Sequence, residues 1–113
     1  MSKRDLNFGK LEIAPEVIFE LINKALKELS NIDLMDGIGE NISEAIKRER
    51  YKKGIKLKFS NNLLSAEIRV KIKKGINIPG IAEKAQKEIK KSIELLSGVK
   101  VNQINILVDN IYG

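Results

Sequence analysis

Residues 55–73, IKLKFSNNLLSAEIRVKIK, contain the pattern that decides the fold. Apolar and polar residues alternate over the first six positions and again over the last ten, so each run has one apolar face and one polar face. Such alternation is typical of strands in a sheet that buries one side. Asn61 and Asn62 separate the two runs and favour a tight turn. This stretch therefore predicts a β-hairpin whose apolar face is covered by other parts of the chain.

Two helical patterns flank the hairpin. Apolar residues recur with helical period over residues 15–30 and 79–97. Pro15 and Pro79 open these segments, and proline suits the first turn because its missing N–H would be unpaired there anyway. Gly98 follows the second segment and is expected to cap its C-terminus. The stripe of the second helix that should face the core comprises Ile81, Ala82, Ala85, Ile89, Ile93 and Leu96.

Weaker patterns fill the remaining segments. Residues 9–13 are expected to form a short strand, and Ile32 and Leu34 fit another. The final strand starts at Val101, where a shift of parity before Ile104 indicates a bulge or a late start. Three isoleucines spaced four apart favour a short helix that ends near position 50; they are Ile38, Ile42 and Ile46.

These elements predict an α+β fold. Two long helices pack on one face of a single sheet, in the order β-α-(β)-β-β-α-β. The chain of 113 residues fits one domain, which we place at residues 9–113 after an N-terminal tail at residues 1–8.

The composition argues against an enzyme. The sequence contains no histidine and no cysteine, which are the usual acid–base catalysts, nucleophiles and transition-metal ligands. Residues 75–80 have the glycine spacing of a phosphate-binding loop, but Ile81 and Ala82 follow where a lysine and a hydroxyl residue are required. We therefore predict no catalytic, cofactor-binding or metal-binding residues, and no cofactor. An acidic stretch is interpreted as a solvated loop; it contains Asp33, Asp36, Glu40 and Glu44.

The net charge of +6 is unevenly distributed, because residues 1–46 carry a net −4 and residues 47–113 a net +10. Alternation sends five cations of the hairpin to the face opposite the predicted helices. This basic face would attract nucleic acid or an acidic partner, although a plain solvated surface fits the pattern as well. The central strands place no aromatic residue there to stack on bases, so nucleic-acid binding would be weak and blind to sequence. The five residues are Lys56, Lys58, Arg69, Lys71 and Lys73.

A second basic segment lies before the hairpin. Its cations follow two of the isoleucines of the predicted short helix, which would make that helix basic and amphipathic. Such a helix binds anionic membranes, and the alternative is ordinary surface or interdomain packing. The segment comprises Lys47, Arg48, Arg50, Lys52 and Lys53.

Three segments resemble motifs of one bacterial family. Residues 9–18, GKLEIAPEVI, resemble the opening motif of the alkaline shock protein family, also called the envelope stress response family. Residues 75–79, GINIP, resemble its second motif, in which a strand end enters the long helix. Residues 101–108 resemble its closing strand. The order and spacing also match, and the resemblance extends from about Phe8 to Ile111.

The resemblance implies a small, non-enzymatic, cytoplasmic stress protein. Members of this family have no established catalytic activity, and some are held near the membrane by a separate membrane-anchored protein. It thus implies a scaffold that works through protein–protein contacts near the envelope, with homo-oligomer formation left open. A weak nucleic-acid-binding module is the alternative. No apolar run reaches the ~18 residues of a membrane span, and the N-terminus lacks the apolar region of a signal peptide.

Overall fold

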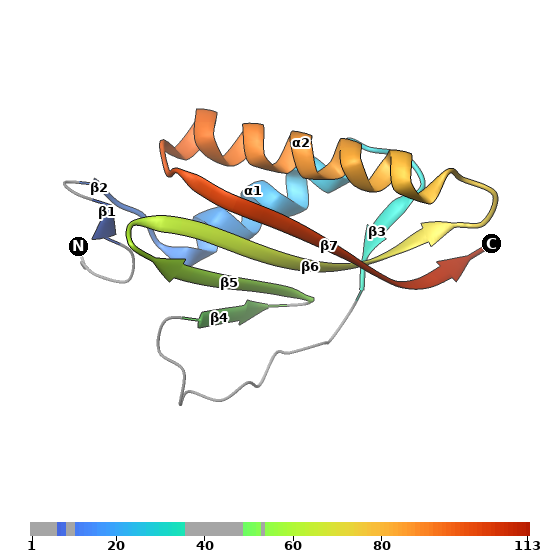
Figure 1. Ribbon diagram of the computed structural model, residues 1–113, viewed down its shortest axis with the longest axis horizontal. Helices are drawn as coiled ribbons and strands as arrows, with labels where there is room; N and C mark the ends of the chain where they lie inside the picture. The colour runs from blue at the N-terminus through green and yellow to red at the C-terminus, as the bar shows by residue number, and fades with distance from the viewer. Residues whose placement is uncertain (1–6, 9–10, 36–48, 53) are drawn as a thin grey trace.

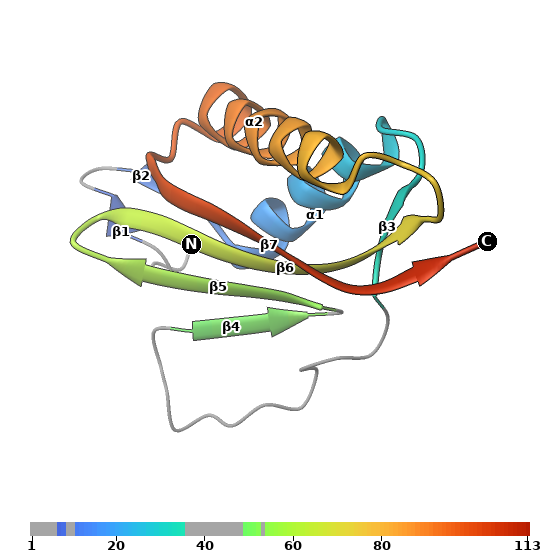
Figure 2. The same cartoon turned by 45° about the vertical axis from the view of Figure 1, so that its right-hand side comes forward.

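A computed structural model describes residues 7–8, 11–35, 49–52 and 54–113. Two helices cover one face of a twisted five-stranded sheet, and a separate two-residue ladder lies near the N-terminus (Figures 1 and 2). The α+β prediction is thus confirmed. The elements are β1 (Asn7–Phe8), β2 (Leu11–Glu12), α1 (Pro15–Lys27), β3 (Ile32–Leu34), β4 (Glu49–Lys52), β5 (Ile55–Ser60), β6 (Leu63–Lys73), α2 (Ile78–Ser97) and β7 (Val101–Tyr112).

The predicted hairpin forms the centre of the sheet. β5 and β6 pair antiparallel from Ile55 opposite Ile68 to Ser60 opposite Leu63. Asn61 and Asn62 take φ values of 52° and 64° in the turn. Asparagine tolerates this left-handed conformation better than most residues, which explains its use at both positions.

β6 has neighbours along both of its edges. β7 runs parallel to it along one edge, and two register shifts leave Asn102 and Asp109 as extra residues in β7. The first shift shows that the change of parity between Val101 and Ile104 is a bulge, which is one of the two alternatives that the sequence left open. Along the other edge, β5 pairs with the first half of β6, and β3 pairs antiparallel with Val70–Ile72.

The change of neighbour along β6 occurs at the backbone of Arg69. Its N–H donates to the carbonyl of Gly54 at 2.9 Å, and its own carbonyl accepts from the N–H of Met35 at 2.9 Å. Gly54 has φ +85°, and a Cβ at this position would lie 2.7 Å from the Met35 carbonyl oxygen. Only glycine fits here without moving the backbone.

Local signals fix both helices. Pro15 opens α1 as predicted, although α1 ends at Lys27, before the predicted limit at residue 30. The Asn77 side chain accepts a hydrogen bond from the N–H of Gly80 at 2.9 Å and so caps α2. Gly98 ends α2 with φ 79°, which confirms the predicted C-cap.

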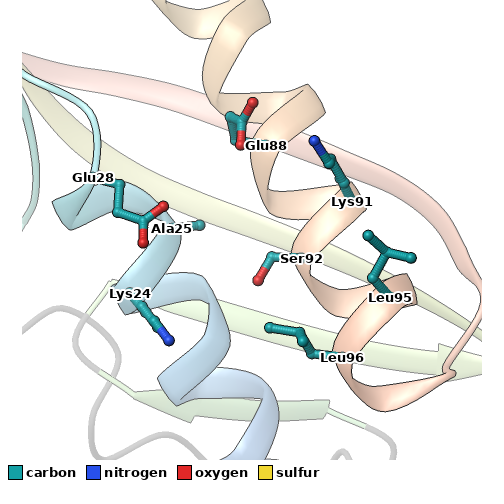
Figure 3. A pocket seen from close by; sticks show the side chains of 8 residues that line it. All are labelled: Lys24, Ala25, Glu28, Glu88, Lys91, Ser92, Leu95 and Leu96. Atoms are coloured by element: carbon teal, nitrogen blue, oxygen red, sulfur yellow. The ribbon is translucent and has the colours of Figure 1, made fainter.

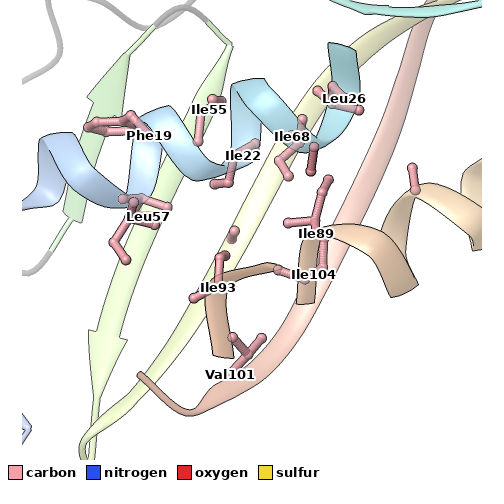
Figure 4. Packing of buried hydrophobic residues seen from close by; sticks show 14 of the residues in the cluster. Phe19, Ile22, Leu26, Ile55, Leu57, Ile68, Ile89, Ile93, Val101 and Ile104 are labelled. Carbon is pink, nitrogen blue, oxygen red and sulfur yellow. The ribbon is translucent and has the colours of Figure 1, made fainter. Parts of the chain in front are cut away.

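The core lies between the helices and the sheet (Figure 4). Alternate residues of β5 and β6 face it, and Leu57, Leu64 and Ile68 have no exposed surface. The predicted stripe of α2 is correct for Ala85, Ile89 and Ile93 but wrong for Leu96. Leu96 is 64% exposed, in the last turn of α2.

Two predicted segments differ from the structure. The short helix expected to end near Arg50 is wrong at its end, because Glu49–Lys52 form β4 and pair antiparallel with β5. Its three isoleucines lie outside the described residues. The strand expected over residues 9–13 is shorter, since β2 covers Leu11–Glu12 and pairs with β1.

The glycine at position 54 provides a test of the neighbour change along β6. Gly54→Ala should destabilise the fold by about 2–5 kcal/mol, because two effects add. Alanine at this positive φ strains the backbone by about 1–3 kcal/mol, and its Cβ also clashes with the Met35 carbonyl oxygen. Gly75→Ala is the matched control, since Gly75 has φ +90° and open space around it. Denaturant unfolding measures both, and equal losses in the two variants would contradict the close approach.

Candidate interaction surface

The five predicted cations share the sheet face away from the helices. The register pairs Lys56 with Glu67 and Lys58 with Ser65, and directly paired residues lie on the same face. Arg69, Lys71 and Lys73 follow on β6 with the same parity, alternating with buried residues. The pleat of β5 and β6 therefore brings the whole basic set together, on a surface that we call the open face.

The open face also holds acidic groups from other strands. Glu67 belongs to it by alternation, and β3 places Asp33 opposite Lys71. Asp109, from the second bulge of β7, accepts a hydrogen bond from Arg69 Nη1 at 2.8 Å and forms an ion pair with it. The open face thus mixes both signs and is not the purely cationic platform that alternation along β5 and β6 alone indicated.

The Arg69–Asp109 pair joins β6 to β7 across the open face. Its side chains are 37% and 27% exposed, so water screens much of their attraction, and such a pair contributes at most about 1 kcal/mol. The hydrogen bond and the charge of Asp109 raise the pKa of Arg69 above its ordinary value. Arg69 is therefore a permanent cation that already has a partner within its own chain.

Tyr112 brings an aromatic ring to the open face, at the end of β7. The Lys71 ammonium lies 5.6 Å from the ring centroid, within the range of a cation–π contact. Partial burial raises the pKa of Tyr112, and a hydrogen bond to Asp33 together with the negative charge of Asp33 raises it further. Sequence reasoning missed this cluster because β7 reaches β6 through parallel pairing between distant segments.

The second basic segment falls only partly within the described residues. Arg50 and Lys52 belong to the backbone of β4, in register with Leu57 and Ile55. Lys47, Arg48 and Lys53 lie outside the described residues. The prediction of a basic amphipathic helix is therefore wrong at positions 50 and 52, because side chains in a strand alternate between two faces and do not follow the 3.6-residue period of a helix.

A groove of about 290 Å³ lies between α1 and α2 on the side away from the sheet (Figure 3). Leu95 and Leu96 border it near the C-terminal end of α2 and are 71% and 64% exposed. Ala25 and Ser92 are small residues on facing helices, which leaves room between them. The charged residues along the groove are Lys24, Glu28, Glu88 and Lys91.

Comparison with known proteins identifies the family. The sequence profile of the alkaline shock protein 23 family, described as having a cell envelope-related function, matches residues 3–112. The chain belongs to this family. The resemblance carried by the three sequence motifs is thereby confirmed.

The chain is similar to curated proteins from Bacillus subtilis and Streptococcus pyogenes. The chain is 27% identical to the uncharacterized protein YqhY of Bacillus subtilis over 107 residues, covering 94% of this chain and 79% of the relative. It is 23% identical to the uncharacterized protein Spy1614 of Streptococcus pyogenes, covering 91% and 88%. No solved structure shows a significant match.

Each of the three family motifs lies at a defined place in the fold. The first motif leads from β2 into α1, the second joins β6 to α2, and the third belongs to β7. All three therefore mark the elements that meet at β6 and its helical cover. Among the described residues, no helix of this family member is long and apolar enough to cross a membrane.

The Tyr112–Asp33 contact predicts the alkaline limit of stability. A raised pKa in the folded state stabilises the fold below about pH 10, and this contribution is lost as the pH rises through the folded pKa. In a Tyr51→Phe background, which leaves Tyr112 as the single tyrosine, absorbance titration should give a pKa above about 10. Asp33→Asn should lower this pKa. Asp109→Asn should not, because Asp109 faces Arg69; a similar fall in both variants would contradict the assignment.

Proposed function

We propose that this family member is a non-enzymatic scaffold of the bacterial stress response at the cell envelope, and that it binds an amphipathic helix of a membrane-anchored protein in the groove between α1 and α2. The proposal starts from the cell envelope-related function of the family. The groove and its exposed leucines support the place of contact that we propose.

The observation that carries this proposal is the pair of exposed leucines. A single exposed apolar residue is ordinary, but Leu95 and Leu96 are adjacent, more than 60% exposed and beside a groove. Antiparallel neighbours α1 and α2 form two walls, and a third helix can lay its apolar face between such walls. Burying each leucine against a partner removes a large apolar surface from water, which favours association.

The charges along the groove favour a protein over a bare membrane surface. Lys24 and Lys91 are balanced by Glu28 and Glu88, so the groove has no surplus of cations. An anionic bilayer attracts clusters of basic residues, whereas a helix with both signs on its flanks can pair with all four side chains. The partner that we propose therefore has leucine-type residues on one face and charged residues of both signs beside them.

The non-enzymatic part of the proposal rests on composition. Without histidine or cysteine, acid–base and nucleophilic chemistry would depend on carboxylates, lysines and hydroxyl groups alone. The described carboxylates of the open face, such as Asp109 and Asp33, contact basic or phenolic partners. These contacts support structural roles for the two carboxylates.

Nucleic-acid binding is a second candidate, favoured by the five cations and Tyr112 on the open face. Asp33, Glu67 and Asp109 counter this charge, and Arg69 is already paired. The remaining attraction would be electrostatic, and therefore weak, sensitive to salt and similar for any polyanion.

The groove proposal predicts that the partner helix binds beside Leu95 and Leu96 and that replacing both leucines weakens this binding. A photoreactive residue at position 95 should crosslink in cells to an amphipathic helix of a membrane-anchored protein. A synthetic peptide of that helix should bind the purified chain, and Leu95→Ser with Leu96→Ser should weaken binding by at least about tenfold, because two apolar contacts are lost.

The matched control is Ile111→Ser, which removes an exposed apolar residue from β7, away from the groove. It should leave the peptide affinity unchanged. Thermal unfolding should show that all variants fold. Equal binding by the double serine variant, or crosslinks confined to lipid or soluble proteins, would reject the groove as the partner site.

The open face gives a separate prediction that decides between the two candidates. Single-stranded RNA, single-stranded DNA and heparin should bind weakly and comparably, with affinity falling as salt rises. Lys58→Glu with Lys73→Glu should weaken all three about as much as Lys84→Glu with Lys90→Glu on α2, because only net charge matters. All four lysines are exposed, so folding is preserved. RNA-selective binding lost only in the sheet-face variant would favour the nucleic-acid candidate.

A further inference from the structure

β7 leaves a long edge of the sheet open. It has 12 residues and, among the strands that the structure describes, pairs with β6 alone (Figures 1 and 2). Natural proteins usually protect such an edge with lysine, proline, a bulge or a cover. β7 contains no lysine and no proline, and its one charged residue, Asp109, is paired with Arg69 of the same chain.

The protection that β7 does have lies at its two ends. Bulges at Asn102 and Asp109 interrupt the register with β6 near the start and near the end. The Gln86 amide of α2 donates to the Ile104 carbonyl at 2.9 Å, and the Asn110 side chain accepts from the Ile111 N–H at 2.8 Å. A regular stretch, residues 105–108, remains between these bulges and hydrogen bonds.

The middle of the edge is apolar on both faces. Ile106 and Val108 lie on the helix side, opposite core residues of β6, and Leu107 lies on the open side, opposite Arg69. All three are only partly buried, although Ile104 earlier in the strand is 6% exposed. An additional strand beside β7 would cover their remaining surface and satisfy the backbone of the edge.

We propose that this strand is β7 of a second copy, paired antiparallel about a twofold axis at Ile106. Paired residues share a face, so this register sets Ile104 opposite Val108 and Asn105 opposite Leu107. Asp109 falls opposite Gln103, and no like charges meet. The axis is perpendicular to the sheet, and two five-stranded sheets join into one with all helices on the same side.

The absence of cysteine from the chain permits a direct test of this register. Ile106→Cys places one thiol of each copy beside the axis. Directly paired residues of antiparallel strands have Cα atoms about 4.5–5.5 Å apart, and a disulfide needs a Cα separation of roughly 4.4–6.8 Å. Mild oxidation should therefore give a covalent dimer. Asn102→Cys is the control: the two thiols would lie about 27 Å apart along the paired strands and should not crosslink. Faster crosslinking of the exposed Asn102→Cys would overturn the proposal, because it indicates random collision.

Charge variants test the same pairing without a covalent bond. Asn105→Lys with Leu107→Lys places like charges directly opposite each other twice and should raise the dimer dissociation constant by at least about tenfold. Asn105→Asp with Leu107→Lys places opposite charges at the same pairs and should restore the dimer. Sedimentation over micromolar to millimolar concentrations measures both, and circular dichroism confirms folding. A monomer at all concentrations, or equal dissociation constants for the two charge variants, would overturn the proposal.

This inference does not depend on the groove. Leu95→Ser with Leu96→Ser should leave the sedimentation of the chain unchanged, since both residues line the groove between α1 and α2 and neither belongs to β7. Loss of the dimer in that variant would assign self-association to the helical side and reject pairing through β7.

Discussion

The structure depends on the backbone of β6, whose eleven residues need hydrogen-bond partners along both edges. β7 serves one edge over almost its full length. The other edge is shared by β5 and β3, which meet at Arg69. The two helices can pack on one continuous apolar face only because this shared edge keeps β6 in a regular strand through the change of neighbour. Gly54 is the local cost of that arrangement, since its backbone must approach Met35 too closely for a side chain.

Arg69 also organises the charges of the open face. The Arg69 backbone holds β5 and β3 together on one side of β6, while its guanidinium reaches Asp109 of β7 on the other side. A surface with five cations therefore carries its own counter-charges from β3, β6 and β7. Such a mixed surface attracts polyanions less than its lysine content suggests, because each paired carboxylate cancels a charge within a few ångströms.

Patterns in short stretches of sequence predicted the elements that depend on short-range interactions. The β5–β6 hairpin follows from alternation and two asparagines, and α2 follows from its period, Pro79 and Gly98. The parallel partner of β6 and the position of Asp109 could not be predicted, because both depend on pairing between distant segments and on a bulge. β4 was missed because its four residues, three of them charged, show no alternation. Leu96 fits the helical period of the core stripe, but it lies in the last turn of α2 and is exposed there.

The groove and the edge of β7 lie on different sides of the molecule, and this separation has a consequence for the scaffold that we propose. A twofold axis perpendicular to the sheet keeps the helices of both copies on one side, so a pair joined through β7 presents two grooves in the same direction. A partner held in a membrane also presents its helices from one direction. Binding at the first groove then raises the effective concentration at the second, and two weak contacts give a long-lived assembly. Neither surface needs to be strong alone, which agrees with a groove that offers only two exposed leucines.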